Sequence, residues 1–121
     1  MPKGDSYRWV KLETQLPLDV LVNENQEIAA VSVAGKHFCI GYHDGNYYAF
    51  DKNCPHAGAG LDMGWINAEG CVVCPNHRYT YRLEDGKEIT GQGVRLKTYP
   101  VEGRSDGIYI GMPKRKWFNW F

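Results

Sequence analysis

Two segments, CPHAGAG at residues 54–60 and CPNHRYTY at residues 74–81, carry most of the information in this chain. Each contains one cysteine and one histidine, and these four residues are Cys54, His56, Cys74 and His77. Thiolate and imidazole groups are common protein ligands of transition metals. A proline after each cysteine fixes the backbone φ angle and removes an N–H donor, which stiffens both segments. We therefore expect the four side chains to form one metal centre.

The spacing C-x-H, then seventeen residues, then C-x-x-H resembles the cluster-binding loops of Rieske iron–sulfur proteins. The resemblance extends to the strand pair before the first segment and to RLKTYPV after the second, and it covers most of residues 7–111. It implies a [2Fe–2S] cluster with two thiolate ligands on one iron and two imidazole ligands on the other. By position, the resemblance implies that Cys54 and Cys74 bind the buried iron. His56 and His77 would bind the outer iron.

A mononuclear zinc site is the alternative metal centre, because tetrahedral zinc also uses two cysteines and two histidines. Zinc modules, however, usually space two cysteines together and two histidines together, whereas each segment here mixes the two residue types. The mixed spacing favours the iron–sulfur cluster.

The composition of the chain limits the remaining functional classes. A length of 121 residues fits one domain, residues 1–121, and a formal net charge of zero gives no reason to expect nucleic acid as a partner. No apolar run approaches the roughly 20 residues of a membrane span, and the first residues lack the apolar core of a secretory signal. Two further cysteines, Cys39 and Cys71, are expected to be small buried side chains. These features predict a cytoplasmic protein.

The strand pattern predicts an all-β fold. Apolar and aromatic residues alternate with polar ones at residues 7–12, 27–33 and 36–50, and the Asp44-Gly45 pair predicts a tight hairpin turn. A last hairpin is expected around residues 105–107. No apolar 3.6-residue period persists, so helix should be scarce. We expect a small antiparallel sandwich or barrel as the base domain, with a cluster-binding subdomain inserted at about residues 52–82.

The C-terminal tail, residues 112–121, combines three basic residues with four aromatic ones. Burial statistics for aromatic residues favour a tail that folds back on the base domain. The alternative is a docking peptide for a partner or for a second copy of the chain.

The resemblance implies a soluble one-electron carrier and not an enzyme. A Rieske ferredoxin of this kind passes electrons from a reductase to a terminal oxygenase or similar acceptor. We expect no additional iron domain of the kind that oxygenase subunits carry. The chain also resembles the Rieske-like small subunit of NAD(P)H-dependent nitrite reductases, and this subunit role is the alternative function. A structural role with a silent cluster is a third, weaker alternative.

The chain also departs from the high-potential members of the family. Ala59 and Asn76 stand where those members carry two disulfide-forming cysteines, and Tyr79 stands where they carry a serine. The chain keeps a tyrosine at Tyr81, and we expect its hydroxyl to donate a hydrogen bond to the Cys74 sulfur. These differences predict a potential in the lower half of the Rieske range.

Overall fold

The computed structural model describes residues 7–14, 17–33, 35–55, 58–91 and 93–113. Within these ranges it consists largely of β-strands. The helical elements there are two short turns, α1 (Leu18–Leu21) and η2 (Leu61–Met63). The predicted scarcity of helix is confirmed, and the all-β fold class with it.

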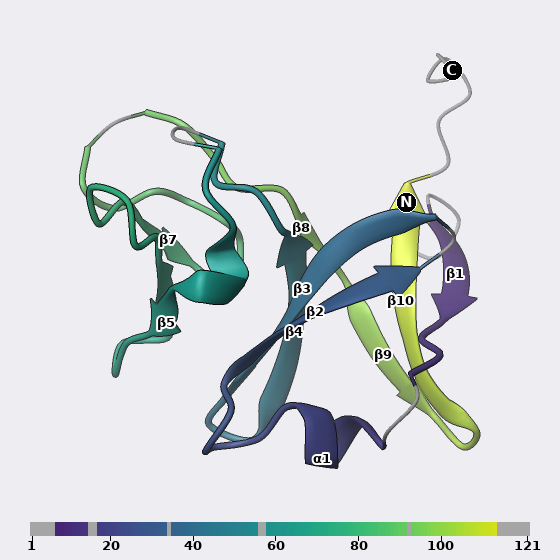
Figure 1. The fold of residues 1–121 in the computed structure, drawn as a ribbon. Coiled ribbons are helices and arrows are strands. Elements are labelled where there is room, and N and C mark those ends of the chain that lie inside the picture. The colour runs from purple at the N-terminus through teal and green to yellow at the C-terminus, as the bar shows by residue number, and fades with distance from the viewer. Residues whose placement is uncertain (1–6, 15–16, 34, 56–57, 92, 114–121) are drawn as a thin grey trace.

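Seven strands form the base domain as two antiparallel sheets (Figure 1). The first sheet has the order β1 (Tyr7–Lys11), β10 (Gly107–Pro113) and β9 (Val101–Arg104). The second has the order β2 (Ile28–Val33), β3 (Lys36–His43), β4 (Asn46–Asp51) and β8 (Thr98–Tyr99). Residues from both sheets share one core, so the sheets pack face to face as a small sandwich. The predicted Asp44-Gly45 turn joins β3 to β4, with φ angles of 52° and 84°.

The alternation predicted for the central strands is confirmed by their burial. Val31 and Val33 of β2 and Phe38 and Ile40 of β3 all lie in the core between the two sheets. Successive side chains of a strand point to opposite faces, so these four share one face of the second sheet.

A separate lobe lies between β4 and β8, at residues 52–97 (Figure 1). Its sheet has the order β5 (Trp65–Ile66), β6 (Cys71–Val73) and β7 (Thr80–Arg82). The range of about 52–82 predicted for this subdomain includes all three strands. The chain then continues in the same lobe, because Leu83 and Leu96 belong to its core.

The lobe packs against the outer face of the second sheet. Cys39 and Phe50, whose side chains point away from the sandwich core, are fully buried against the lobe. At Gly41 the fit is close, since a Cβ there would lie 3.1 Å from Ile66 Cδ1 and 3.1 Å from Phe50 Cε1. Strand β3 is therefore covered on both faces, and this contact joins the lobe to the base domain.

Residues 114–121 lie outside the described ranges, so both predictions for the aromatic tail remain predictions. No described helix has the length and apolar character that a membrane-crossing segment needs.

Candidate metal centre

The two sequence segments form loops that are closed by the same backbone hydrogen bond. The N–H of Cys54 donates to the carbonyl oxygen of Ala59 at 2.8 Å, and the N–H of Cys74 donates to that of Tyr79 at 2.8 Å. In each loop the bond joins the cysteine to the residue five positions later. Gly58 has a φ of +71°, a conformation that glycine adopts without strain. The sequence thus builds two similar hairpin loops, each of which begins at a cysteine.

The loops bring the two predicted cysteine ligands together inside the lobe. Cys54 is 2% exposed and Cys74 is fully buried. The two side chains lie close enough to interact directly: burial raises the pKa of the Cys74 thiol, and a hydrogen bond with Cys54 raises it further. All four cysteines of the chain lie within the described residues, and none forms a disulfide. Two neighbouring buried sulfurs without a disulfide fit the donor set of a metal centre.

Two further groups contact these sulfurs. The backbone N–H of Asn76 donates to Cys74 Sγ at 3.4 Å, which lowers the pKa of the Cys74 thiol. The hydroxyl of Tyr81 lies 3.1 Å from Cys54 Sγ. The prediction that Tyr81 bonds to Cys74 was therefore wrong. Tyr81 lies on β7, which follows the second loop, and its side chain extends across the lobe to the sulfur of the first.

Tyr81 is completely buried. Burial, followed by the hydrogen bond with Cys54, raises the pKa of the Tyr81 phenol above its usual range. The phenol therefore stays protonated at any physiological pH and is able to donate to a thiolate. Tyr81 pairs across a β-bridge with Glu88, a buried carboxylate that accepts hydrogen bonds from the backbone N–H and the hydroxyl of Thr90.

The predicted histidine ligands differ in what the structure describes. His77 lies on the second loop, close to Cys74, and its side chain is exposed. Its ring meets that of Tyr79 edge to face, with centroids 6.2 Å apart. His56 lies outside the described residues, so its assignment stays a prediction. The structure thus brings Cys54 and Cys74 together and places His77 on the surface beside them.

One feature of the second loop was missed in the sequence. His77 and Arg78 both have left-handed backbone conformations, with φ angles of 66° and 59°. Such angles are uncommon for residues other than glycine. A glycine in the sequence would have indicated a left-handed conformation, whereas histidine and arginine do not indicate one.

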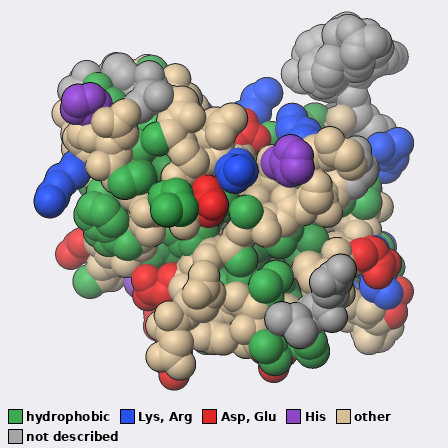
Figure 2. Space-filling view, in the orientation of Figure 1, with side chains coloured by type: hydrophobic (Ala, Val, Ile, Leu, Met, Phe, Trp, Pro, Cys, Tyr) green, Lys and Arg blue, Asp and Glu red, His purple; other side chains and the backbone are tan. Residues whose placement is uncertain are grey.

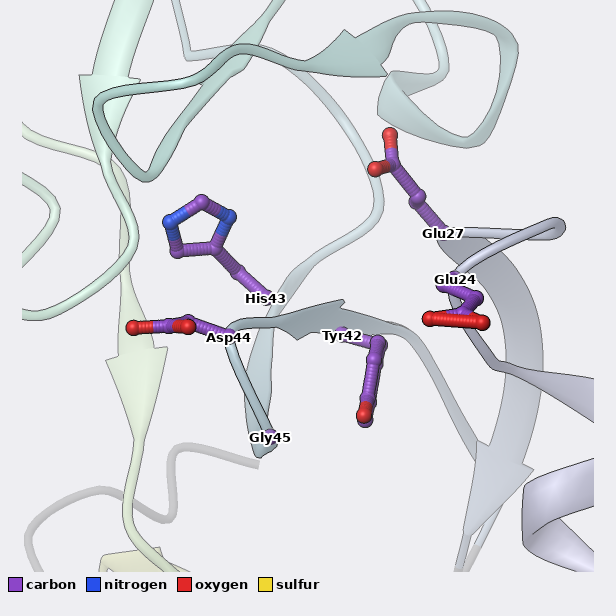
Figure 3. A pocket seen from close by; sticks show the side chains of 6 residues that line it. All are labelled: Glu24, Glu27, Tyr42, His43, Asp44 and Gly45. Carbon is purple, nitrogen blue, oxygen red and sulfur yellow. The ribbon is translucent and has the colours of Figure 1, made fainter.

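Four other cysteine and histidine side chains are not among the predicted ligands, and one of them, Cys39, belongs to the same buried cluster as Cys54 and Cys74. Cys39 and Cys71 are buried, as predicted. His43 lines an open hollow with Glu27 and Asp44 on the base domain (Figure 3), and its ring packs beneath Gly70 of the lobe. His37 is exposed on β3.

Comparisons with known proteins agree with this geometry. The family model of the Rieske [2Fe-2S] domain matches residues 11–100. The chain is 29% identical over 69 residues to the ferredoxin component of the alkene monooxygenase system of Xanthobacter autotrophicus, and the alignment covers 57% of each protein. It is 34% identical over 70 residues to the 3-phenylpropionate/cinnamic acid dioxygenase ferredoxin subunit of Photorhabdus laumondii, with 57% of this chain and 67% of that protein covered.

A solved structure shows the same similarity. The ferredoxin of carbazole 1,9a-dioxygenase from Nocardioides aromaticivorans superposes with a TM-score of 0.70 at 27% identity, and the match covers 88% of this chain and 98% of that one. The family carries a Rieske-type [2Fe–2S] cluster. With the matched range, the two loops and the two buried sulfurs in agreement, this chain belongs to the Rieske [2Fe-2S] domain family.

Proposed function

We propose that this chain is a one-electron carrier, a Rieske ferredoxin that accepts electrons from a reductase and delivers them to a terminal oxygenase or similar acceptor. The observation that carries the proposal is the pair of buried sulfurs on two similar loops, beside an exposed histidine. The relatives support the same role, since two named for monooxygenase or dioxygenase systems are ferredoxin components. The carbazole dioxygenase neighbour is also a ferredoxin.

Four residues are proposed to hold the cluster: Cys54, His56, Cys74 and His77. When bound, a cluster held by four protein ligands supplies a one-electron couple and offers no open coordination position for a substrate. The lobe excludes water from the two sulfurs by burying them. The N–H of Asn76 and the hydroxyl of Tyr81 provide positive dipoles that stabilise negative charge on those sulfurs. Exposed His77 gives a redox partner close access to the site.

The proposal includes a cytoplasmic location, which four cysteines without a disulfide support. The alternative function is a Rieske-like small subunit of a nitrite-reductase-type complex, for which the aromatic tail at residues 112–121 would provide the contact face for self-association. If the chain is such a subunit, we expect it to aggregate or to self-associate tightly when it is purified alone. Size-exclusion chromatography separates the two functions, because a monomer supports the ferredoxin, and stable self-association, through the tail or another face, supports the subunit.

The ligand assignment is tested by alanine substitution of each cysteine, with iron and acid-labile sulfide measured in the purified protein. The wild type should contain about two irons and two sulfides per chain. Cys54→Ala and Cys74→Ala should contain neither, because each removes a ligand on which assembly depends. Cys39→Ala and Cys71→Ala are matched controls at buried positions and should keep both. One zinc ion without sulfide in the wild type would contradict the proposal.

A further inference from the structure

Exposed apolar side chains gather at one end of the lobe. Four large hydrophobic side chains are exposed among the described residues, and two of them, Met63 at 74% and Trp65 at 42%, lie two positions apart. Single exposed hydrophobic residues are ordinary, whereas neighbouring ones are typical of interaction sites. Figure 2 shows hydrophobic side chains on the flank of the lobe that Figure 1 labels β5 and β7.

The backbone between these two residues lies against the start of the second loop. Gly64, which lies between them, is pressed against the loop: a Cβ there would lie 2.0 Å from the carbonyl oxygen of Val73 and 3.3 Å from Pro75 Cδ. Trp65 is also paired with Val73 in the lobe sheet. The segment that carries Met63 and Trp65 therefore packs beside the loop that carries His77.

The positively charged side chain of Arg78 lies next to one of these apolar side chains, that of Trp65. The guanidinium carbon of Arg78 lies 5.8 Å from the centre of the Trp65 ring, and Arg78 is exposed. Within the described part of the chain, Arg78 forms no salt bridge. Its left-handed conformation costs a residue with a side chain about 1 kcal/mol, and strain of this kind is concentrated at functional sites. The arrangement holds an uncompensated positive charge one residue from His77.

Carboxylate side chains also lie near Trp65. Trp65 also lines one side of an open hollow whose charged lining residues are Glu24, Glu27 and Asp62. Glu24 and Glu27 also line the hollow in Figure 3, where both extend from the same edge of the base domain. An anionic molecule would be repelled from these hollows and attracted to Arg78, so charge fixes which way it docks.

We propose that Met63, Trp65 and Arg78 form the docking surface for a redox protein whose contact face carries a carboxylate that pairs with Arg78. The apolar side chains provide the desolvated centre of the contact, and Arg78 provides its electrostatic anchor. The inference rests on the proposed electron-carrier function. It adds the position of the docking surface and the charge of the partner face.

The charge is tested with two electron acceptors of opposite surface charge, the acidic copper protein plastocyanin and the basic haem protein cytochrome c. The reduced holo-protein is mixed with each in a stopped-flow instrument, and the second-order rate constant is measured at low and high salt. Arg78→Glu should lower the rate constant with plastocyanin by roughly tenfold at low salt and raise it with cytochrome c. High salt should remove most of both changes.

Two variants serve as controls for Arg78→Glu. Arg78→Lys keeps the charge and should keep most of the wild-type rate. Arg104→Glu removes a second arginine that also lies over aromatic rings, those of Trp9 and Tyr109, but on the first sheet of the base domain. It should leave both rate constants nearly unchanged. Arg78→Glu effects no larger than those of Arg104→Glu, or equal in sign for both acceptors, would overturn the docking surface.

The apolar part is tested by Met63→Gln, with Val20→Gln as the matched control at another exposed hydrophobic residue, on α1. Met63→Gln should lower the rate constant with plastocyanin severalfold at both salt concentrations, and Val20→Gln should not. Equal effects of the two substitutions would remove Met63 from the surface. A wild-type protein that reduces neither acceptor would overturn the electron-carrier function itself, and the docking surface with it.

Discussion

The Tyr81 hydroxyl lies 3.1 Å from Cys54 Sγ, in the core of the lobe. An O–H donor stabilises a sulfur most when that sulfur carries most negative charge, which is the reduced state of a metal–thiolate centre. Burial keeps water from replacing this donor. The hydroxyl is therefore expected to raise the reduction potential.

Replacing Tyr81 by phenylalanine removes the donor and keeps the ring. The shift equals the difference in hydrogen-bond strength between the reduced and oxidised states, and a difference of about 1 kcal/mol corresponds to roughly 40 mV for one electron. Tyr81→Phe should lower the potential by about this amount in protein-film voltammetry. Tyr99→Phe is the control, because the Tyr99 hydroxyl bonds to Asp51 in the base domain. Similar shifts in the two variants would contradict the assigned role.

Cys39 is a second residue whose surroundings have a measurable consequence. It is fully buried between the second sheet and the lobe, and burial, with a smaller contribution from Asp62, raises the pKa of its thiol to about 12. The folded protein therefore holds the thiol proton more tightly than the unfolded chain does. The stability that this provides is complete below the unfolded pKa and is lost as pH rises towards the folded pKa.

The free energy of unfolding of the wild type should therefore fall, relative to that of Cys39→Ala, as pH rises from about 9 to about 12. The limiting slope is about 1.4 kcal/mol per pH unit. Urea unfolding of both proteins across this range measures the difference, and the comparison cancels the titration of other groups. A difference that stays constant with pH would show that the thiol is accessible to water in the folded state.

Among the secondary-structure elements, the turn at Gly86 fixes how the chain leaves β7. Gly86 has a φ of +78°, and a Cβ there would lie 1.9 Å from the carbonyl oxygen of Leu96. The N–H of Leu96 also donates to the carbonyl oxygen of Gly86 at 2.9 Å. The turn therefore requires glycine for two reasons, its backbone angle and the closeness of a second backbone segment.

Gly86→Ala should destabilise the protein by roughly 2–4 kcal/mol, the sum of backbone strain and overpacking. Gly35→Ala is a close control, because Gly35 has the same φ of +78° and nothing within 4 Å of its added Cβ. Gly35→Ala should lower the free energy of unfolding by only about 1 kcal/mol. Urea unfolding of the two variants separates the two contributions, and equal losses would mean that the Leu96 segment moves away at little cost.

At the scale of the whole molecule, the lobe and the base domain have separate cores. The lobe sheet consists of strands of 2, 3 and 3 residues, and its core contains both Cys54 and Cys74. The base domain has longer strands and a core without either sulfur. The free energy of metal binding is therefore expected to stabilise the lobe most.

Removal of iron with a chelator should increase amide hydrogen exchange throughout residues 52–97, while β2 and β3 stay largely protected. Exchange in the two parts reports separate opening reactions. Mass spectrometry of peptides from the iron-loaded and iron-free protein measures both. Loss of protection to the same extent in both parts would show that the chain unfolds as one unit without its metal.

The sequence alone was sufficient for the features that depend on neighbours along the chain. Alternation predicted the faces of β2 and β3, and the Asp44-Gly45 pair predicted the turn, because backbone conformation there is a local property. The Cys and His spacing predicted the two loops and their family. The assignment of His56 and His77 as ligands remains a prediction on the same basis.

Only the tertiary structure decided which groups meet across the chain. Tyr81 lies seven residues after Cys74, yet its hydroxyl reaches Cys54 of the other loop. Strand β3 is covered on both faces because the lobe folds back over Cys39, and Arg78 meets Trp65 because the second loop turns through a left-handed backbone. These contacts join residues far apart in sequence, and side-chain packing, which no local pattern encodes, selects them.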